Sequence, residues 1–433
     1  MKKSIILISA GLALSGTIAF GQSRASGFYK DFFIDSGLSM SDHEFIPAAR
    51  VLNLSTEVIL LPSKAQNATE YELALTHDCF VGSDCDDNGR LLYPDGAPRY
   101  KMIYIPGGTA NRHGESVTAE GREHIRMFFN NGGSYIGTCA GTILCSTGFY
   151  YKDRDGKPVD RDMYFKVWPG YTTGTKLFDS YTSLTVEKKC PLLKYYDFGG
   201  DMRLDSVRHN NGSYMNTVVW PAGTEALLRY VGDTLKLAKS IDKEISVLAY
   251  KPNEKSGRMV VTGSHPELPV TGERLQLFTS MFHYALDGNG VPQVKAALTS
   301  GEPRKMVKGT KDNDPAFTRI GDKQFHHFTI DVPKGTKVVS VKLESVKGYS
   351  NYDLFLYAAP GKFAFNDVAR WFDVTKGIDK VMVIKNPKAG KLYISVYCDT
   401  TVDVVKTAYG EQYTGRTDVL NGVPYVLTAT IEQ

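Results

Sequence analysis

The chain has 433 residues, of which 42% are hydrophobic and 23% charged; this is an ordinary globular composition, and the length suits two or three domains. The formal net charge is only +4 and no block of basic residues occurs, so the charge pattern argues against a nucleic-acid partner.

The first residues predict a secretory signal peptide. Lys2 and Lys3 precede an uncharged, mostly apolar stretch over 4–20, and Gly21 ends it in a frame of small residues. The alternative is a single membrane anchor, which the glycines and serines of the stretch disfavour. We expect residues 1–21 to be removed and the mature protein to be secreted or periplasmic, with no membrane contact of its own.

Apolar runs and amphipathic stretches alternate from about residue 28. We expect strands at 31–39, 57–62, 101–108 and 134–138, and helices at 41–54, at 118–133 and from Ala140 onward. The helix at 118–133 has the clearest signals, since Thr118 can cap it and two glycines end it. Strands that alternate with helices predict a mostly parallel sheet with helices on both faces.

Residues 150–260 are rich in Tyr, Gly and Asp and contain several β-type runs whose arrangement the pattern does not define. The run at 257–267 predicts a final strand with a polar end. The stretch at 274–288 predicts a helix with one apolar stripe. An α/β domain is therefore expected over residues 28–290.

The pattern changes after a linker predicted at 291–305. Over residues 306–433, alternating strands are broken by Pro-Gly, Pro-Lys-Gly and Lys-Ala-Gly turns, and helical periodicity is nearly absent. Several short strands at this spacing predict an all-β sandwich as a second domain.

Cys139 lies in the frame Gly-Thr-Cys-Ala-Gly, between an apolar strand and a predicted helix. This is the cysteine form of a nucleophile elbow, a strained turn in which glycines such as Gly137 and Gly141 give the nucleophile room. A helix N-terminus behind the sulfur stabilises a thiolate, and the N–H of Ala140 can face a developing oxyanion. The alternatives are half of a disulfide or a buried cysteine in a glycine-rich turn, and Cys145 fits the core better.

Export also permits disulfides among the six cysteines. Cys79 and Cys85 flank a short loop and are candidates to close a small ring, but their spacing does not decide whether they do. The chain has no CxxC pair and no partnered histidine pair, so the spacings do not suggest zinc.

A thiolate nucleophile needs a base, and His265 is the best placed of the nine histidines. It follows the C-terminal end of a predicted strand, where the active sites of open α/β sheets form. Glu267 is two residues further on, and a carboxylate there can hold the imidazole in the required tautomer, as the third member of a triad does. The alternative is a loop histidine with an acid nearby by chance.

A second oxyanion donor should come from another strand end. Gly107 and Gly108 follow Pro106 at the end of the strand predicted at 101–108. Glycine allows the backbone to approach a substrate carbonyl closely. The alternative is a plain turn that ends the strand.

Three motifs therefore follow one another: Pro-Gly-Gly after a strand, then G-x-C-x-G, then His-Pro-Glu. In this order they resemble the class I glutamine amidotransferase-like superfamily. The stretches IPGGTANRH, NNGGSYIGTCAGTILCS and GSHPEL are most similar to the domain named after the N-terminal part of biotin-protein ligases. The resemblance covers the predicted α/β domain and implies a flavodoxin-like, doubly wound fold. It also implies a set of roles: nucleophile Cys139, base His265, orienting carboxylate Glu267, and oxyanion groups Gly108 and Ala140.

The context departs from that superfamily. Glutamine amidotransferases supply ammonia to a cytoplasmic synthetase, whereas this chain has a predicted export signal and no recognisable synthetase domain. We therefore expect a thiol hydrolase of an amide or peptide-like C–N bond, acting on a small molecule or peptide without a cofactor. An ester or thioester hydrolase would use the same groups, and a non-catalytic exported binding protein on the same fold is the alternative.

The C-terminal region resembles a different family. The stretches FHHFTIDVPKGTKVVSVKLES, YDLFLYAAPGK and NPKAGKLYISVY are similar to the bacterial pre-peptidase C-terminal domain, which occurs on secreted hydrolases. The resemblance covers about residues 306–433 and implies an accessory β-sandwich rather than a catalytic unit. It makes this sandwich a candidate for contact with a cell surface or a glycan.

The stretch DCDDNGRLLYPD has near-calcium-loop spacing. It places Asp84, Asp86 and Asn88 at alternate positions, then a glycine, with Asp95 as the twelfth residue. An aspartate stands where a bidentate glutamate is usual, and no flanking pair of helices is visible. A solvated loop is the favoured interpretation, and calcium is the weaker alternative.

Overall fold

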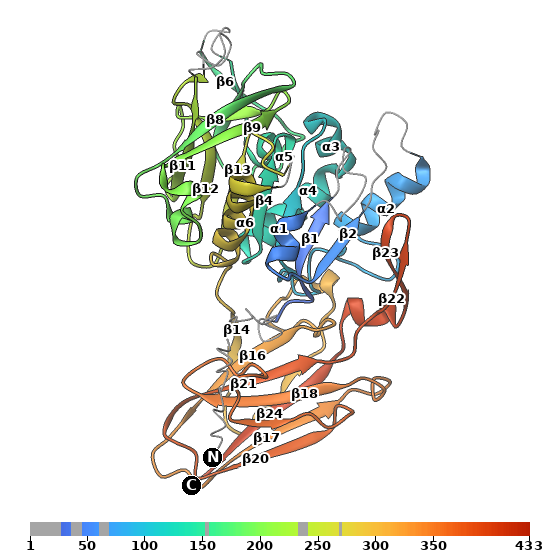
Figure 1. Cartoon of the computed structure of the whole chain (residues 1–433). Coiled ribbons are helices and arrows are strands. Elements are labelled where there is room, and N and C mark those ends of the chain that lie inside the picture. The colour runs from blue at the N-terminus through green and yellow to red at the C-terminus, as the bar shows by residue number, and fades with distance from the viewer. Residues whose placement is uncertain (1–26, 36–45, 60–68, 152–155, 233–240, 268–270) are drawn as a thin grey trace, which may run out of the picture.

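The computed structural model of the chain describes residues 27–35, 46–59, 69–151, 156–232, 241–267 and 271–433. These residues form an α/β unit and a C-terminal sandwich of two β-sheets (Figure 1). The predicted signal peptide lies outside the described residues. No helix in the described part of the chain has the length and apolarity needed to cross a bilayer.

Five parallel strands form the middle of the large sheet, in the order β2, β1, β3, β4, β13. In that order they span Thr56–Ile59, Lys30–Asp35, Tyr100–Ile105, Ser134–Thr138 and Met259–Thr262. The strands predicted at 101–108 and 134–138 are confirmed within a few residues. Because all five strands run the same way, their C-terminal ends lie along one edge of the sheet.

Helices cover both faces of these strands. One face carries α1 (Pro47–Val51) and α6 (Gly272–Leu286). The other face carries α2 (Glu70–Phe80), α3 (Ala110–Ser116), α4 (Thr118–Asn130) and α5 (Ala140–Cys145). Alternation along β3 explains the two layers, because Met102 and Tyr104 enter one apolar core while Ile103 and Ile105 enter the other.

The region between residues 148 and 250 extends the sheet with mainly antiparallel strands. Beyond β13 the sheet continues through β12 (Ile245–Tyr250), β10 (Ser213–Asn216), β7 (Tyr171–Gly174), β5 (Gly148–Tyr150) and β6 (Pro158–Asp160). A branch from β12 adds β11 (Thr224–Val231), β8 (Ser180–Val186) and β9 (Arg203–His209). The prediction of a mostly parallel sheet is therefore wrong for the whole: the sheet is mixed, with a parallel centre.

The C-terminal sandwich encloses its own apolar core. One sheet has the order β14 (Val294–Ala297), β16 (Phe325–Val332), β21 (Gly390–Cys398), β18 (Leu354–Pro360), β19 (Trp371–Asp373). The other has the order β15 (Arg304–Met306), β24 (Tyr425–Glu432), β17 (Val338–Ser345), β20 (Lys380–Lys385). The strand β14 and the first two residues of β15 lie in the stretch 291–305 predicted as a linker, so strands of the sandwich begin there.

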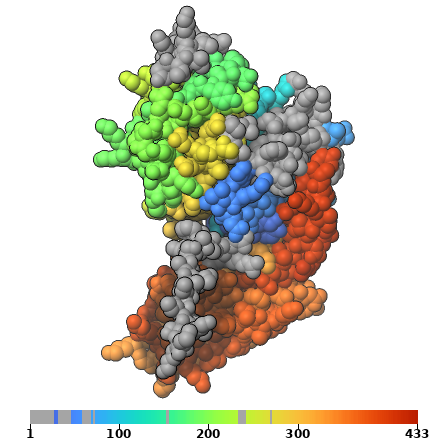
Figure 2. Space-filling view, in the orientation of Figure 1, coloured from blue at the N-terminus to red at the C-terminus, as the bar shows by residue number. Residues whose placement is uncertain are grey.

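A hairpin from the C-terminal region joins the α/β sheet. Its strands are β22 (Asp403–Thr407) and β23 (Gly410–Gly415), and Gly410 pairs with Ile59 at the end of β2. Figure 1 shows the two red strands beside β2, and Figure 2 shows the same red segment lying along the α/β unit. The edge of the α/β sheet is thus covered by a segment some 350 residues later in the chain.

Buried charges cross this contact. We call the following group the junction cluster: Lys30, Glu57, Arg90, Arg99, Asp322 and Tyr413. Nη2 of Arg99 donates to both carboxylate oxygens of Asp322, at 2.9 and 3.1 Å. The fully buried Glu57 carboxylate accepts from Nη1 of Arg90 at 3.2 Å and from the Tyr413 hydroxyl at 3.0 Å. Burial raises the pKa of Asp322, although Arg99 opposes this rise.

Candidate active site

Cys139 occupies a strained turn between β4 and α5. Its backbone has φ 48° and ψ −104°, a conformation that non-glycine residues adopt only when the surrounding structure imposes it. The amide of Cys139 donates to the carbonyl of Thr262 on the neighbouring strand β13, at 2.9 Å. This strain and this strand-to-helix position are those of a nucleophile elbow.

Close packing explains the glycines on both sides of Cys139. A Cβ on Gly141 would lie 2.0 Å from the carbonyl oxygen of Ile105, and a Cβ on Gly137 would lie 2.8 Å from the backbone of Gly141. The amide of Gly141 also donates to the carbonyl of Pro106 at 3.1 Å. Gly141 is therefore required by the approach of the turn to β3, and Gly137 by the approach of α5 to β4.

His265 and Glu267 lie beside Cys139 because β13 is the parallel neighbour of β4. Thr262, the last residue of β13, pairs with Thr138, the last residue of β4, so the segments that follow both strands meet. Nδ1 of His265 lies 2.9 Å from Oε1 of Glu267, and the two side chains are only 12% and 8% exposed. Oε1 of Glu267 also accepts from the Thr138 hydroxyl at 3.0 Å. We call Cys139, His265, Glu267 and Thr138 the active-site cluster.

The pKa of His265 reflects these neighbours. Burial alone lowers it, but the Glu267 carboxylate and the sulfur of Cys139 outweigh burial and raise the pKa to about 10. Because Nδ1 faces Glu267, Nε2 is the ring nitrogen left for the thiol. A protonated imidazole beside the sulfur stabilises a thiolate, which is the nucleophilic form of cysteine.

The turn after β3 brings Gly107 close to His265 and Cys139. A Cβ on Gly107 would lie 2.7 Å from Cε1 of His265 and 3.4 Å from Cβ of Cys139, so Gly107 lines the space between both side chains. Gly108 is exposed, with a φ of 148° that favours glycine. Ala140 is buried as the first residue of α5. The oxyanion role predicted for the amides of Gly108 and Ala140 stays a prediction, because the direction of a Cβ on Gly107 does not show which amide of the turn faces the sulfur.

Antiparallel strands of the middle region supply neighbours that the sequence did not reveal. The carbonyl of Asn210 lies 3.8 Å from the sulfur of Cys139, which is only 6% exposed. Arg208 pairs with the backbone of His265. His209 is fully buried, with Nε2 2.8 Å from the Thr182 hydroxyl, and burial together with His265 lowers its pKa to about 3. No local motif marks these residues, since only strand pairing brings them to the site.

The other five cysteines differ from Cys139 in setting. All six are free, so the disulfide ring considered for Cys79 and Cys85 is not formed. Cys145 is fully buried, its thiol donates to the carbonyl of Thr142 at 3.0 Å, and burial raises its pKa. Cys85 is the one exposed thiol among them, which makes it a reference for reactivity.

The near-calcium loop does not converge on one point. Asp84 is exposed, while Asn88 donates to the carbonyl of Tyr93 at 2.6 Å. The Asp95 carboxylate is buried against Lys295 and accepts from Gln324 at 2.8 Å. Within the described ranges no group of three or more His, Cys, Asp or Glu side chains, Asp86 included, is arranged to hold a metal ion.

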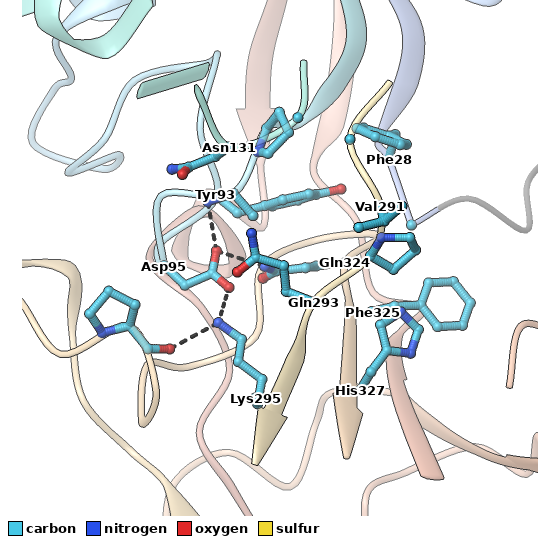
Figure 3. A pocket seen from close by; sticks show the side chains of 17 residues that line it. Phe28, Tyr93, Asp95, Asn131, Val291, Gln293, Lys295, Gln324, Phe325 and His327 are labelled. Carbon is cyan, nitrogen blue, oxygen red and sulfur yellow. Dashed lines mark hydrogen bonds and ion pairs between the residues drawn. The ribbon is translucent and has the colours of Figure 1, made fainter. Parts of the chain in front are cut away.

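Asp95 instead lines a cavity of about 360 Å³ between the α/β unit and the sandwich. Figure 3 shows its carboxylate directed at Lys295 and Gln324, with Phe28, Tyr93 and Phe325 among the other lining side chains. No residue of the active-site cluster lines this cavity. Two charged groups on its wall, Asp95 and Lys295, are paired with each other.

Comparison with known proteins agrees with part of this picture. Residues 96–285 match the family described as biotin-protein ligase, N terminal. This range contains the whole active-site cluster. No curated protein matches the chain.

Two solved structures show weak similarity. The periplasmic inhibitor PliG of g-type lysozyme from Aeromonas hydrophila is 20% identical, over 25% of this chain and 76% of its own, with a TM-score of 0.16. The pre-peptidase C-terminal domain of collagenase from Bacillus anthracis is 12% identical, over 33% of this chain and all of its own, with a TM-score of 0.18. TM-scores this low say nothing about function.

Proposed function

We propose that the protein is an exported thiol hydrolase that cleaves an amide or peptide-like C–N bond with Cys139, His265 and Glu267. The observation that carries the proposal is the pairing of His265 with Glu267 at 2.9 Å beside a cysteine held at φ 48°. A strained nucleophile, a base and an orienting carboxylate are the three groups that acyl transfer through cysteine requires.

Each group has one role in the proposed reaction. The Cys139 thiolate attacks the carbonyl carbon, and the electron pair of the C=O bond moves to oxygen. The amide of Ala140 and an amide of the Pro-Gly-Gly turn, Gly108 by the resemblance, stabilise this oxyanion. Protonated His265 gives its proton to the leaving amine as the C–N bond breaks, which leaves a thioester on Cys139.

The second half regenerates the enzyme. Neutral His265 removes a proton from water, the resulting hydroxide attacks the thioester, and the carboxylic acid product leaves as the C–S bond breaks. Glu267 holds the ring so that Nδ1–H stays on the carboxylate and Nε2 exchanges protons with the reacting groups. The reaction needs no redox partner, since only proton and acyl transfers occur.

We also propose a flavodoxin-like core within the glutamine amidotransferase-like superfamily. Support comes from the parallel strands, which stand in the sheet in the sequence order 2-1-3-4-5, and from a cluster at their C-terminal ends. The N-terminal stretch with the signal pattern supports an extracytoplasmic location.

One observation favours the alternative of a non-catalytic binding protein. Cys139 is only 6% exposed and lies under the Asn210 carbonyl, so a substrate must displace or pass that segment. Substrate-dependent movement of a covering segment is common in enzymes, and apo geometry does not rule out a nucleophile.

The test is a hydrolysis screen with the full chain, using libraries of amino-acid amides and short peptides and measuring released amine. We expect at least one substrate to be cleaved by the wild type and none by Cys139→Ala. The matched control is Cys145→Ala, which removes a buried thiol from the same helix. Cleavage that persists in Cys139→Ala, or an inert wild-type chain, would contradict the proposal.

A further inference from the structure

A short chain of hydroxyl groups ends on the carboxylate of the active-site cluster. The Tyr104 hydroxyl lies 2.9 Å from Oγ1 of Thr138, and Oγ1 of Thr138 donates to Oε1 of Glu267 at 3.0 Å. The same Oε1 faces Nδ1 of His265 at 2.9 Å. Tyr104 and Thr138 are fully buried, on the adjacent parallel strands β3 and β4.

The donors and acceptors fix the direction of this chain. An ionised carboxylate only accepts, so the single hydroxyl proton of Thr138 points at Glu267. Thr138 must then accept from Tyr104, whose hydroxyl keeps its proton because burial raises its pKa well above the usual value. Glu267 thus receives two N–H or O–H donors on one oxygen, while its other oxygen, Oε2, has no hydrogen-bond partner among the described residues.

Both hydroxyl groups are rigidly held. Thr138 is the last residue of β4, immediately before Cys139, so its backbone moves with that of the nucleophile. The Tyr104 ring packs edge-on against Phe278 of α6 at 5.6 Å between centroids, and against Phe282 at 6.3 Å. The hydroxyl chain therefore ties the carboxylate that orients His265 to the strand that carries Cys139.

We propose that Thr138, itself held by Tyr104, is a positioning residue of the proposed active site. It fixes the rotation of the Glu267 carboxylate, and with it the His265 ring that faces Cys139. This inference rests on the proposed function but assigns roles beyond the triad. Without the Thr138 hydroxyl, the Glu267 carboxylate keeps only its contact with His265 and is less fixed in rotation, because Oε2 has no hydrogen-bond partner among the described residues.

Thr138→Val tests the proposal, since it removes the hydroxyl and keeps the β-branched shape. Alkylation of Cys139 by iodoacetamide in the full chain is followed by peptide mass mapping from about pH 5 to about pH 9, with Cys85 as the exposed reference thiol in the same sample. We expect Thr138→Val to slow alkylation of Cys139 about tenfold, as for loss of a hydrogen bond to a charged group. The loss should be greatest at low pH, so that the pH profile approaches that of Cys85.

Three further variants separate positioning from general damage. Thr138→Ser keeps the hydroxyl and should restore the wild-type rate and profile. Thr279→Val removes a fully buried hydroxyl on α6 that has no hydrogen-bond partner among the described residues. It should change neither the alkylation rate of Cys139 nor its pH profile. Tyr104→Phe should slow alkylation of Cys139 less than Thr138→Val does. If Thr138→Val does not fold, Tyr104→Phe replaces it as the test variant.

The outcomes distinguish this inference from the proposed function. A wild-type Cys139 that reacts faster than Cys85 at low pH, with Thr138→Val unchanged, overturns the positioning role alone. If Thr138→Ser slows alkylation of Cys139 as much as Thr138→Val does, the positioning role is also overturned, because loss of the hydroxyl is then not the cause of the slower rate. A wild-type Cys139 no more reactive than Cys85 overturns both.

Discussion

The junction cluster and the active-site cluster are both buried and hydrogen-bonded, yet they use their charges differently. In the junction cluster the two carboxylates, Glu57 and Asp322, each contact cations, and the Arg99 guanidinium also lies 4.5 Å from the centre of the Tyr29 ring. In the active-site cluster the Glu267 carboxylate contacts the His265 imidazole, which lies beside the sulfur of Cys139. Nε2 of His265 and Oε2 of Glu267 have no nitrogen or oxygen partner within the described ranges; Nε of Arg99 in the junction cluster also has none, but its backbone is not strained.

Under the proposed function, this difference separates a cluster that stabilises the fold from a cluster that reacts. Removing one partner of a buried ion pair costs a large amount of folding free energy, because the other charge is left buried and unpaired. The junction cluster therefore keeps the sandwich fixed to the α/β sheet. Atoms left unpaired beside a strained backbone conformation are costly for stability, and such features gather at functional sites. Variants of the two clusters should therefore fail in different ways.

The largest effect is expected for Cys139→Ala. Removal of the nucleophile should lower hydrolysis of any substrate found by at least about 10³-fold. The midpoint of urea unfolding should stay within the small range usual for minor truncations. If Cys139→Ala hydrolysed the substrate at a rate close to that of the wild type, Cys139 would not be the nucleophile.

Asp322→Asn should have the next largest effect, on stability. It leaves the fully buried Arg99 without its counterion, which costs about 3–5 kcal/mol in the free energy of unfolding. The control is Asp403→Asn, which breaks an exposed pair with Arg416 and should cost no more than about 1 kcal/mol. Alkylation of Cys139 should be the same in both folded variants; equal stability losses would contradict the role given to the junction cluster.

Gly107→Ala should damage the site without unfolding the protein. The added methyl would lie 2.7 Å from Cε1 of His265, so the ring must shift from its position beside Cys139. A misplacement of this kind costs about 10²-fold in rate, measured as alkylation of Cys139 or hydrolysis. Gly174→Ala is the matched control, because no atom lies within 4 Å of its added methyl.

How far the sequence predicts this site depends on which contacts are local. The elbow around Cys139 and the pair His265 and Glu267 follow from short motifs, and adjacency of their strands brings them together. Asn210 and His209 reach the site through β9 and its pairing, which has no marker in the local pattern. The closeness of Gly107 to His265 and Cys139 depends on backbone torsion that spacing does not encode.

The fold shows the same division. The strand and helix at 134–138 and 118–133 follow from strong local periodicity, whereas α2 and α3 lacked a clear amphipathic signal and were not predicted. The hairpin β22–β23 and the junction cluster were also missed. The hairpin, Asp322 and Tyr413 lie hundreds of residues from their partners, and neither alternation nor charge spacing indicates which sheet edge a hairpin will join.

A pH dependence of stability is also predicted from the pairing of His265 with Glu267. The pKa of His265 is raised in the folded protein to about 10, against about 6.5 in an unfolded chain. The stabilisation from protonated His265 is thus fully present below about pH 6.5 and is lost as the pH rises to about 10. The free energy of urea unfolding should fall over this pH range in the wild type and change less with pH in Glu267→Gln. The same pH dependence in both proteins would contradict the pairing of His265 with Glu267.

The most direct test of the central claim is the rate of iodoacetamide alkylation of Cys139 relative to Cys85 at about pH 6, in the wild type and in His265→Ala. An ordinary exposed thiol ionises near pH 8.5 and reacts slowly at that pH. If Cys139, His265 and Glu267 form a reactive site, Cys139 is labelled faster than Cys85 in the wild type, and the advantage disappears in His265→Ala. A Cys139 that is labelled no faster than Cys85, or one whose rate does not depend on His265, contradicts the account.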